Sequence, residues 1–109
     1  MNSKEIIEES FNPTDEDDIA ILKMSDIFKV LSDPSRLRII LSLQDSELCV
    51  NDLAGITGFS QSSVSHHLKI LRDLNLVRHK RKGKQAFYSL ADAHVSALLA
   101  VAHDHARET

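Results

Sequence analysis

The last twenty residues of this 109-residue chain, LADAHVSALLAVAHDHARET, are rich in side chains that bind metals. They hold three of the six histidines, and two donor pairs stand out: Asp92 with His94, and His105 with Glu108. Imidazole nitrogen and carboxylate oxygen are both zinc ligands, and two of each make a closed tetrahedral set. A closed set predicts a regulatory or structural site, because no coordination position is left for a substrate.

Helix geometry decides how these four residues can meet. If a helix runs from about Asp92, His94, His105 and Glu108 share one face, whereas Asp92 joins them only if it precedes the regular helix. The helical rise separates His94 from His105 by about 16 Å, too far for one metal ion. One chain therefore cannot supply the whole set.

Two antiparallel copies of this segment can supply it. A two-fold axis near positions 99–100 places Asp92 and His94 of one copy beside His105 and Glu108 of the other, giving a C2 homodimer with two identical sites. The residues between the pairs suit such an interface, since Leu98 and Val101 are apolar and alanines are small. Spacing alone leaves a second interpretation open: a polar tail whose histidines favour the negative end of a helix.

A second set of residues is typical of DNA binding. The stretch SQSSVSHHLKILRDLNLV predicts a helix capped by Ser60, with an apolar face of Val64, His67, Leu68, Leu71 and Leu74. Short polar side chains on the opposite face let a backbone approach the bases of a major groove. We predict base contacts from Gln61, Ser62, Ser65 and His66, and phosphate contacts from Lys69 and Arg72. His67 is predicted to be a packed or hydrogen-bonded histidine rather than a DNA contact.

A basic hairpin follows this helix directly. The stretch LVRHKRKGKQAFYSL predicts two strands joined at Gly83. Its cationic side chains are predicted to lie along the DNA backbone or in the minor groove: Arg78, Lys80, Arg81, Lys82 and Lys84. A solvated polar face or a solvated basic turn would each be unremarkable alone, and their adjacency favours a nucleic-acid surface.

The other predicted helices complete the fold that positions the metal-ligand set and the DNA-binding set. A helix is predicted from Asp15, and a second one begins with Asp33 as N-cap and Pro34 in the first position. A short third helix, VNDLAGITG, is predicted to be capped by Asn51 and ended by Gly58. The order predicts a mainly α fold with a small β-hairpin wing (α+β): a homodimeric winged helix-turn-helix at 15–109 with N- and C-terminal dimerisation helices, after an acidic, disordered tail at 1–14.

Bulk properties narrow the class of protein. The length allows one domain with a modest core. The net charge is −3, but residues 1–33 hold nine acids against three lysines, whereas residues 60–88 hold seven bases against one acid. A basic patch can thus bind phosphate despite the net charge. The one cysteine, the lack of a long apolar run and the acidic start predict a cytoplasmic protein without a membrane span or secretory signal.

Several stretches together resemble the ArsR/SmtB family of metal-responsive repressors. They are LSDPSRLRIILSL, ELCVNDLA, SQSSVSHHLKILRDLNLV, R.GK...YSL and DAH...HARE, and they cover nearly everything beyond the acidic tail. The resemblance implies a homodimeric winged-helix repressor that binds operator DNA without metal and releases it when metal binds. It also suggests a metal efflux pump as the regulated gene.

The resemblance also sharpens the choice of metal. The zinc-sensing branch has Asp-x-His, ten residues, and then His-x-x-(Glu or His), a pattern that Asp92, His94, His105 and Glu108 match in full. This implies Zn2+, with Co2+ or Ni2+ as alternatives. Another branch binds softer metals through Cys-x-Cys, where this chain has Cys49-Val50-Asn51. With one thiol missing, Cys49 is predicted to be a small buried residue.

Three other functions compete with a metal-responsive repressor. An enzyme is not predicted, because the sequence has no nucleophile–base pair, glycine-rich phosphate loop or HExxH motif. A winged-helix repressor without metal sensing would use the last helix only for dimerisation. A winged helix that binds only proteins would lack the steep salt dependence of phosphate contacts.

Overall fold

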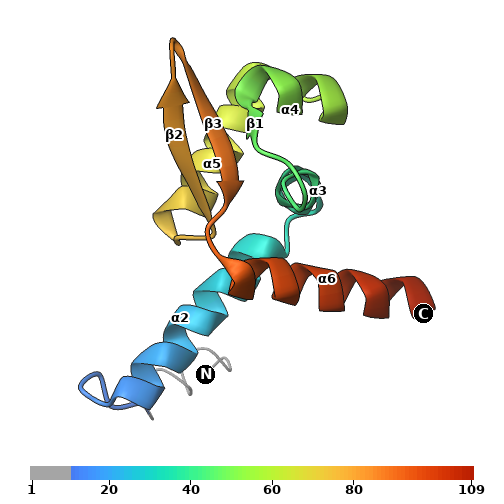
Figure 1. Cartoon of the computed structure of the whole chain (residues 1–109). Helices are drawn as coiled ribbons and strands as arrows, with labels where there is room; N and C mark the ends of the chain where they lie inside the picture. Colours follow the sequence, from blue (N-terminus) through green and yellow to red (C-terminus); the bar gives the residue numbers. More distant parts are fainter. Residues whose placement is uncertain (1–10) are drawn as a thin grey trace.

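The computed structural model describes residues 11–109, and Figure 1 shows the arrangement of its elements. Five helices and a three-stranded sheet follow one another as α2 (Glu16–Leu31), α3 (Pro34–Ser42), β1 (Leu48–Cys49), α4 (Val50–Thr57), α5 (Gln61–Asp73), β2 (Val77–Lys82), β3 (Gln85–Leu90) and α6 (Ala93–Glu108). The predicted mainly α, winged helix-turn-helix architecture is confirmed. The predicted disordered tail at 1–14 falls largely on residues 1–10, outside the described part of the chain, and stays a prediction.

Side-chain caps fix where most helices begin. Asp15, Asp33, Ser60 and Asp92 have extended backbones, and each side chain accepts hydrogen bonds from amides of the following first turn. Pro34 lies in the first turn of α3, where its missing N–H leaves no bond unmade. The predicted starts of α3 and α5 are therefore confirmed.

The start of α4 corrects a prediction. The helix begins at Val50 with Cys49 in the N-cap position, and not after Asn51. Asp52 reaches back so that its Oδ2 accepts from the Cys49 amide at 3.2 Å, while Cys49 also pairs with Phe87 in the sheet. These two contacts hold Cys49 in extended geometry and move the helix start upstream. The predicted end is confirmed, since Gly58 adopts a left-handed φ of 78°.

The wing is an antiparallel sheet in the order β1-β3-β2. Strands β2 and β3 pair from Val77↔Leu90 to Lys82↔Gln85, and Gly83 turns between them with φ 65°. Sequence analysis predicted this hairpin but not β1, because a two-residue strand has too few residues to show a period. Figure 1 shows α2 and α6 at the end of the molecule away from the wing turn.

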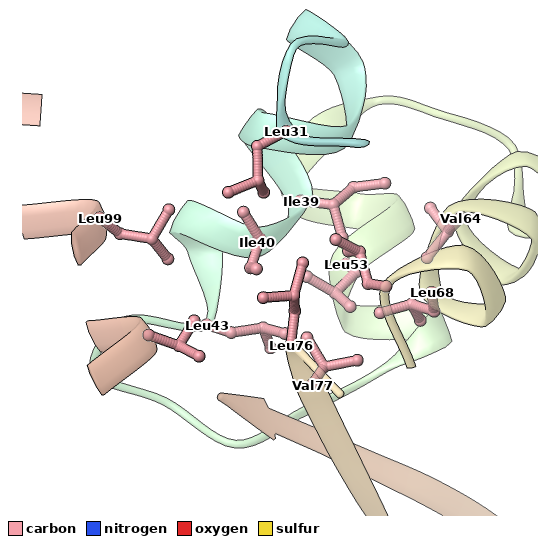
Figure 2. Packing of buried hydrophobic residues seen from close by; sticks show 12 residues of the cluster. Leu31, Ile39, Ile40, Leu43, Leu53, Val64, Leu68, Leu76, Val77 and Leu99 are labelled. Carbon is pink, nitrogen blue, oxygen red and sulfur yellow. The ribbon is translucent and has the colours of Figure 1, made fainter. Parts of the chain in front are cut away.

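One apolar core joins all these elements except the outer wing. Figure 2 shows side chains from α2, α3, α4, α5, β2 and α6 converging on it. On α5, Val64, Leu68 and Leu71 are fully buried. They pack against α3 and α4, so the opposite face of α5 is left to solvent. In residues 11–109, no helix is both long and apolar enough to cross a membrane.

Removing part of this core tests the packing. Leu68→Ala is expected to lower the free energy of unfolding by roughly 2–5 kcal/mol, because lost burial and an unfilled cavity add together. Chemical denaturation followed by circular dichroism measures it. Ile56→Ala on α4 is the control, since Ile56 is 53% exposed; equal losses in the two variants would contradict the described core.

Candidate functional site: nucleic-acid interface and metal ligands

The exposed face of α5 carries the predicted base-contacting residues. Gln61, Ser62, Ser65, His66 and Lys69 are all exposed. They lie opposite the apolar residues that α5 buries, as the helical period predicted. The face combines small hydroxyl side chains with amide, imidazole and ammonium groups, a set that can donate to and accept from base edges and phosphates.

Gln61 has a neighbour that sequence analysis assigned to another role. Its Nε2 donates to Oδ1 of Asn51 on α4 at 2.8 Å. Asn51, predicted to cap α4, instead orients the first side chain of α5. No sequence signal marks this pair, because the two residues meet only when the helix-turn-helix folds.

Arg72 links the end of α5 to the wing. Its Nη1 lies 3.2 Å from Nδ1 of His79 on β2. The His79 ring stacks on Tyr88 of β3, with 5.3 Å between centroids. His79 was not among the predicted site residues, although its alternation with Arg78 and Lys80 places it on the face of β2 toward α5.

The opposite face of β2 carries basic side chains beside an acid. The ammonium groups of Lys80 and Lys82 lie 3.8 Å and 3.1 Å from carboxylate oxygens of Glu47, which precedes β1. Arg78 on the same face donates to Ser89 at 3.4 Å. Arg81, on the other face, donates to the carbonyl oxygen of Lys84 in the turn. The wing thus presents cations on both faces. Glu47 partly neutralises the face that carries Lys80 and Lys82.

His67 is half-buried beside Arg36, as predicted for a hydrogen-bonded histidine. Arg36 Nε donates to its Nδ1 at 3.3 Å. Burial lowers the pKa of His67 below its ordinary value, and the positive charge of Arg36 lowers it further. His67 is therefore neutral near pH 7.

The first predicted pair of metal ligands comes together at the start of α6. Asp92 is the N-cap, in extended conformation, so it precedes the regular helix. Its Oδ1 accepts from the Val95 amide at 3.1 Å and lies 3.6 Å from Nδ1 of His94. This answers the question that the helical angles left open: the carboxylate of Asp92 and the imidazole of His94 are neighbours.

The second pair lies at the far end of the same helix. α6 runs unbroken from Ala93 to Glu108, so the rise keeps His105 about 16 Å from His94. His105 and Glu108 are exposed. Within residues 11–109, no group of three His, Cys, Asp or Glu side chains is placed to hold a metal ion. In this part of the chain, the two predicted ligand pairs therefore lie apart, at opposite ends of α6.

Apolar side chains without a partner lie on the two helices farthest from the wing turn. On α2, Ile21, Met24 and Phe28 form a stripe at helical spacing and are 47%, 52% and 53% exposed. On α6, Leu98 and Val101 are 38% and 70% exposed, between the two ligand pairs. Sequence analysis predicted dimerisation through the N-terminal and C-terminal helices and named Leu98 and Val101 for the second, but it did not name the three stripe residues of α2.

Comparisons with known proteins show which protein family this chain matches. Residues 33–79 match the family described as bacterial regulatory protein, arsR family. The chain is 42% identical to the cadmium resistance transcriptional regulatory protein CadC homolog of Staphylococcus aureus, over 80% of this chain and 73% of that protein. The chain belongs to the arsR family. It is also 47% identical to the transcriptional repressor SmtB homolog of Synechocystis, over 80% of this chain and 66% of that protein.

Solved structures agree with this arsR-family membership. A homodimeric winged helix-turn-helix DNA-binding domain of Mycobacterium bovis, a possible ArsR-family regulator, has a TM-score of 0.80 at 27% identity and covers 89% of this chain and 90% of its own. Reduced HlyU from Vibrio cholerae has a TM-score of 0.74 at 31% identity, covering 82% and 94%. The apolar core and the basic wing described above thus belong to an arsR-family winged helix.

The contact of Glu47 with the wing lysines gives a testable prediction. Glu47→Gln is expected to tighten binding of duplex DNA by roughly 1.4-fold to fivefold, because a surface ion pair worth about 0.2–1 kcal/mol no longer competes with phosphate. Fluorescence anisotropy at low salt measures it. Glu16→Gln, the same charge change at the start of α2, is the control; an equal gain in both variants would show a net-charge effect only.

Proposed function

We propose that this arsR-family chain is a homodimeric transcriptional repressor that binds operator DNA and releases it on binding zinc, with cobalt or nickel as alternative metals. The observation that carries the proposal is the layout of α6. One donor pair lies at each end of this helix, and exposed Leu98 and Val101 lie between the pairs. Among the helices of residues 11–109, α6 alone combines histidine donors toward both ends with exposed apolar residues between them.

The DNA-binding half of the proposal rests on α5 and the wing. The exposed polar face of α5 is shaped for a major groove, with base contacts from Gln61, Ser62, Ser65 and His66. Cations for phosphate contacts flank it: Lys69, Arg72, Arg78, Lys80, Arg81, Lys82 and Lys84. The contact between Arg72 and His79 supports their joint use, because it ties the end of α5 to the wing.

The exposed apolar residues of α2 and α6 support the proposed dimer. The apolar stripes of α2 and α6 are exposed in the single chain, and a second copy of the chain would bury both. With α6 antiparallel to its symmetry mate, the Asp92–His94 pair of one subunit meets the His105–Glu108 pair of the other. The homodimeric M. bovis relative supports this assembly.

The four donors fit zinc chemically. Two imidazoles and two carboxylates can form a closed tetrahedral shell, and Asp92 and His94 are already within 3.6 Å of each other. When bound, the metal supplies a rigid cross-link between subunits and no open coordination position. DNA release then requires that the DNA-bound geometry hold the four donors less well, with the same coupling energy in both directions.

The names of two relatives support a metal input. One is a cadmium resistance regulator homolog, and another is an SmtB homolog of which this chain spans 66% of the length. A soft-metal site is disfavoured here, because Cys49 is buried and the residue two positions on is Asn51.

The second candidate function is a repressor without metal sensing. It is favoured by one observation, that the Asp92 carboxylate already caps α6.

Salt dependence tests DNA binding. Lys69→Gln is expected to reduce the slope of log affinity against log salt by about one and to weaken binding to all duplexes alike, as loss of one phosphate contact should. Lys23→Gln on α2 should leave the slope unchanged. A wild-type protein whose binding does not respond to salt would contradict the DNA interface.

Metal titration tests the sensor. His94→Ala and His105→Ala are each expected to lower zinc affinity by at least about tenfold and to abolish release of DNA by zinc, with metal-free DNA affinity unchanged. Competition with a chelating dye measures the first effect, and anisotropy the second. Continued release of DNA by zinc in either variant would contradict the assignment, and lack of zinc binding by the wild type would favour the second candidate.

Mixing the two variants distinguishes an inter-subunit site from any site within one chain. A mixed dimer joins intact Asp92 and His94 of the His105→Ala chain to intact His105 and Glu108 of the His94→Ala chain. Mixing is therefore expected to restore one complete site per mixed dimer, measured as recovered tight zinc binding. No recovery after verified subunit exchange would contradict the antiparallel arrangement.

A further inference from the structure

Arg36 joins α5 to the junction of α2 and α3, which lies about thirty residues earlier in the sequence. Its guanidinium side chain is only 13% exposed. Nη1 donates to the carbonyl oxygen of Val30 at the end of α2 at 2.9 Å, and Nε donates to Nδ1 of His67 on α5 at 3.3 Å. Nη2 lies 3.8 Å from the Asp33 carboxylate that caps α3. One side chain thus connects α5 to the α2–α3 junction.

The contact depends on the protonation of His67. Arg36 can only donate, so Nδ1 must carry a lone pair and the ring must be neutral. Burial lowers the pKa of His67 most, the charge of Arg36 lowers it further, Asp33 partly opposes them, and the neighbouring His66 adds a small lowering. These are the titratable and charged groups that act on the ring. None belongs to the proposed metal set.

We propose that Arg36 and His67 form a proton-sensitive contact that positions α5 against the α2–α3 junction, and that protonation of His67 breaks it and weakens DNA binding. This inference rests on the proposed function, since it assigns a positioning role for DNA binding by α5. A protonated ring offers no acceptor and places two cations side by side in a half-buried site. The α5 helix then loses its polar connection to the helix that carries the exposed apolar stripe.

The sign of the effect separates this contact from ordinary surface titration. Surface groups that take up protons as pH falls add positive charge, which strengthens attraction to phosphate. Breakage of the Arg36–His67 contact acts in the opposite direction. A protein without a titrating residue at position 67 should therefore bind DNA more tightly in acid than the wild type does.

The decisive comparison is the wild type against His67→Gln. Glutamine keeps an oxygen that accepts from Arg36 Nε but does not titrate. Binding of the full chain to a fixed duplex is measured in chelator at constant ionic strength, from about pH 8 to about pH 5.5, across the range in which histidine titrates. The two proteins are expected to agree above about pH 7, and the wild type to bind about tenfold more weakly at the acid end.

A control and a variant-free measurement complete the test. His103→Gln, an exposed histidine of α6, should keep the wild-type profile. In the wild type, an NMR titration should show the His67 ring with a pKa below its ordinary value of 6.5. A His67 ring that titrates at or above 6.5 would overturn the proposal.

Unfolding without DNA provides an independent readout. The unfolded chain takes up a proton on His67 near 6.5, and the folded chain only at lower pH. The stability from neutral His67 is therefore fully present above 6.5 and is lost as pH falls toward the folded-state value. His67→Gln should lack this loss. Identical pH profiles of unfolding and of DNA binding in the two proteins would overturn the proposal.

The same measurements separate this proposal from the proposed function. No DNA binding by either protein would contradict the proposed function, and with it the effect on DNA. The ring titration and the unfolding profile would then still support or overturn the contact itself.

Discussion

Burial of one face of α5 is the constraint on which the rest of the structure depends. Val64, Leu68 and Leu71 lose all contact with water against α3 and α4. Because side chains three and four positions apart share a helix face, this burial dictates which residues α5 presents outward. It also brings His67 beside Arg36 and Gln61 beside Asn51. The polar surface of α5 is thus a consequence of how its apolar surface packs.

Acidic and basic residues are concentrated in different parts of the chain, and the small net charge does not show this separation. The acids gather toward α2 and the bases toward the end of α5 and the wing, while the net charge is only −3. Glu47 is an exception, an acid held against two wing lysines. It keeps these flexible side chains near one face of β2 in the absence of a polyanion. Local arrangement of charge, rather than the total, therefore governs what this surface can attract.

The fold was largely predictable from local signals, and the site only in part. Caps such as Asp33 and Ser60, the left-handed Gly58 and the alternating hairpin are encoded within a few residues of sequence. Glu47, Asn51 and His79 were missed because each acquires its role from a residue on another element. The start of α4 was misplaced for the same reason, since Cys49 is held by the sheet as well as by Asp52. Contacts between residues on different elements produce no periodic pattern in the sequence.

The distal half of α6 projects with every residue from Ala100 onward exposed. Residues 11–99 do not cover those turns, so within the described part of the chain their helical order depends on the helix propensity of their own residues. The helical order of this segment would then depend on dimer formation, and therefore on the concentration of the protein. Dilution would unfold the tip, and any ion held between one such tip and the start of the partner subunit's α6 would be bound with a strength that rises with the number of copies per cell. Gene dosage would then set the threshold of response.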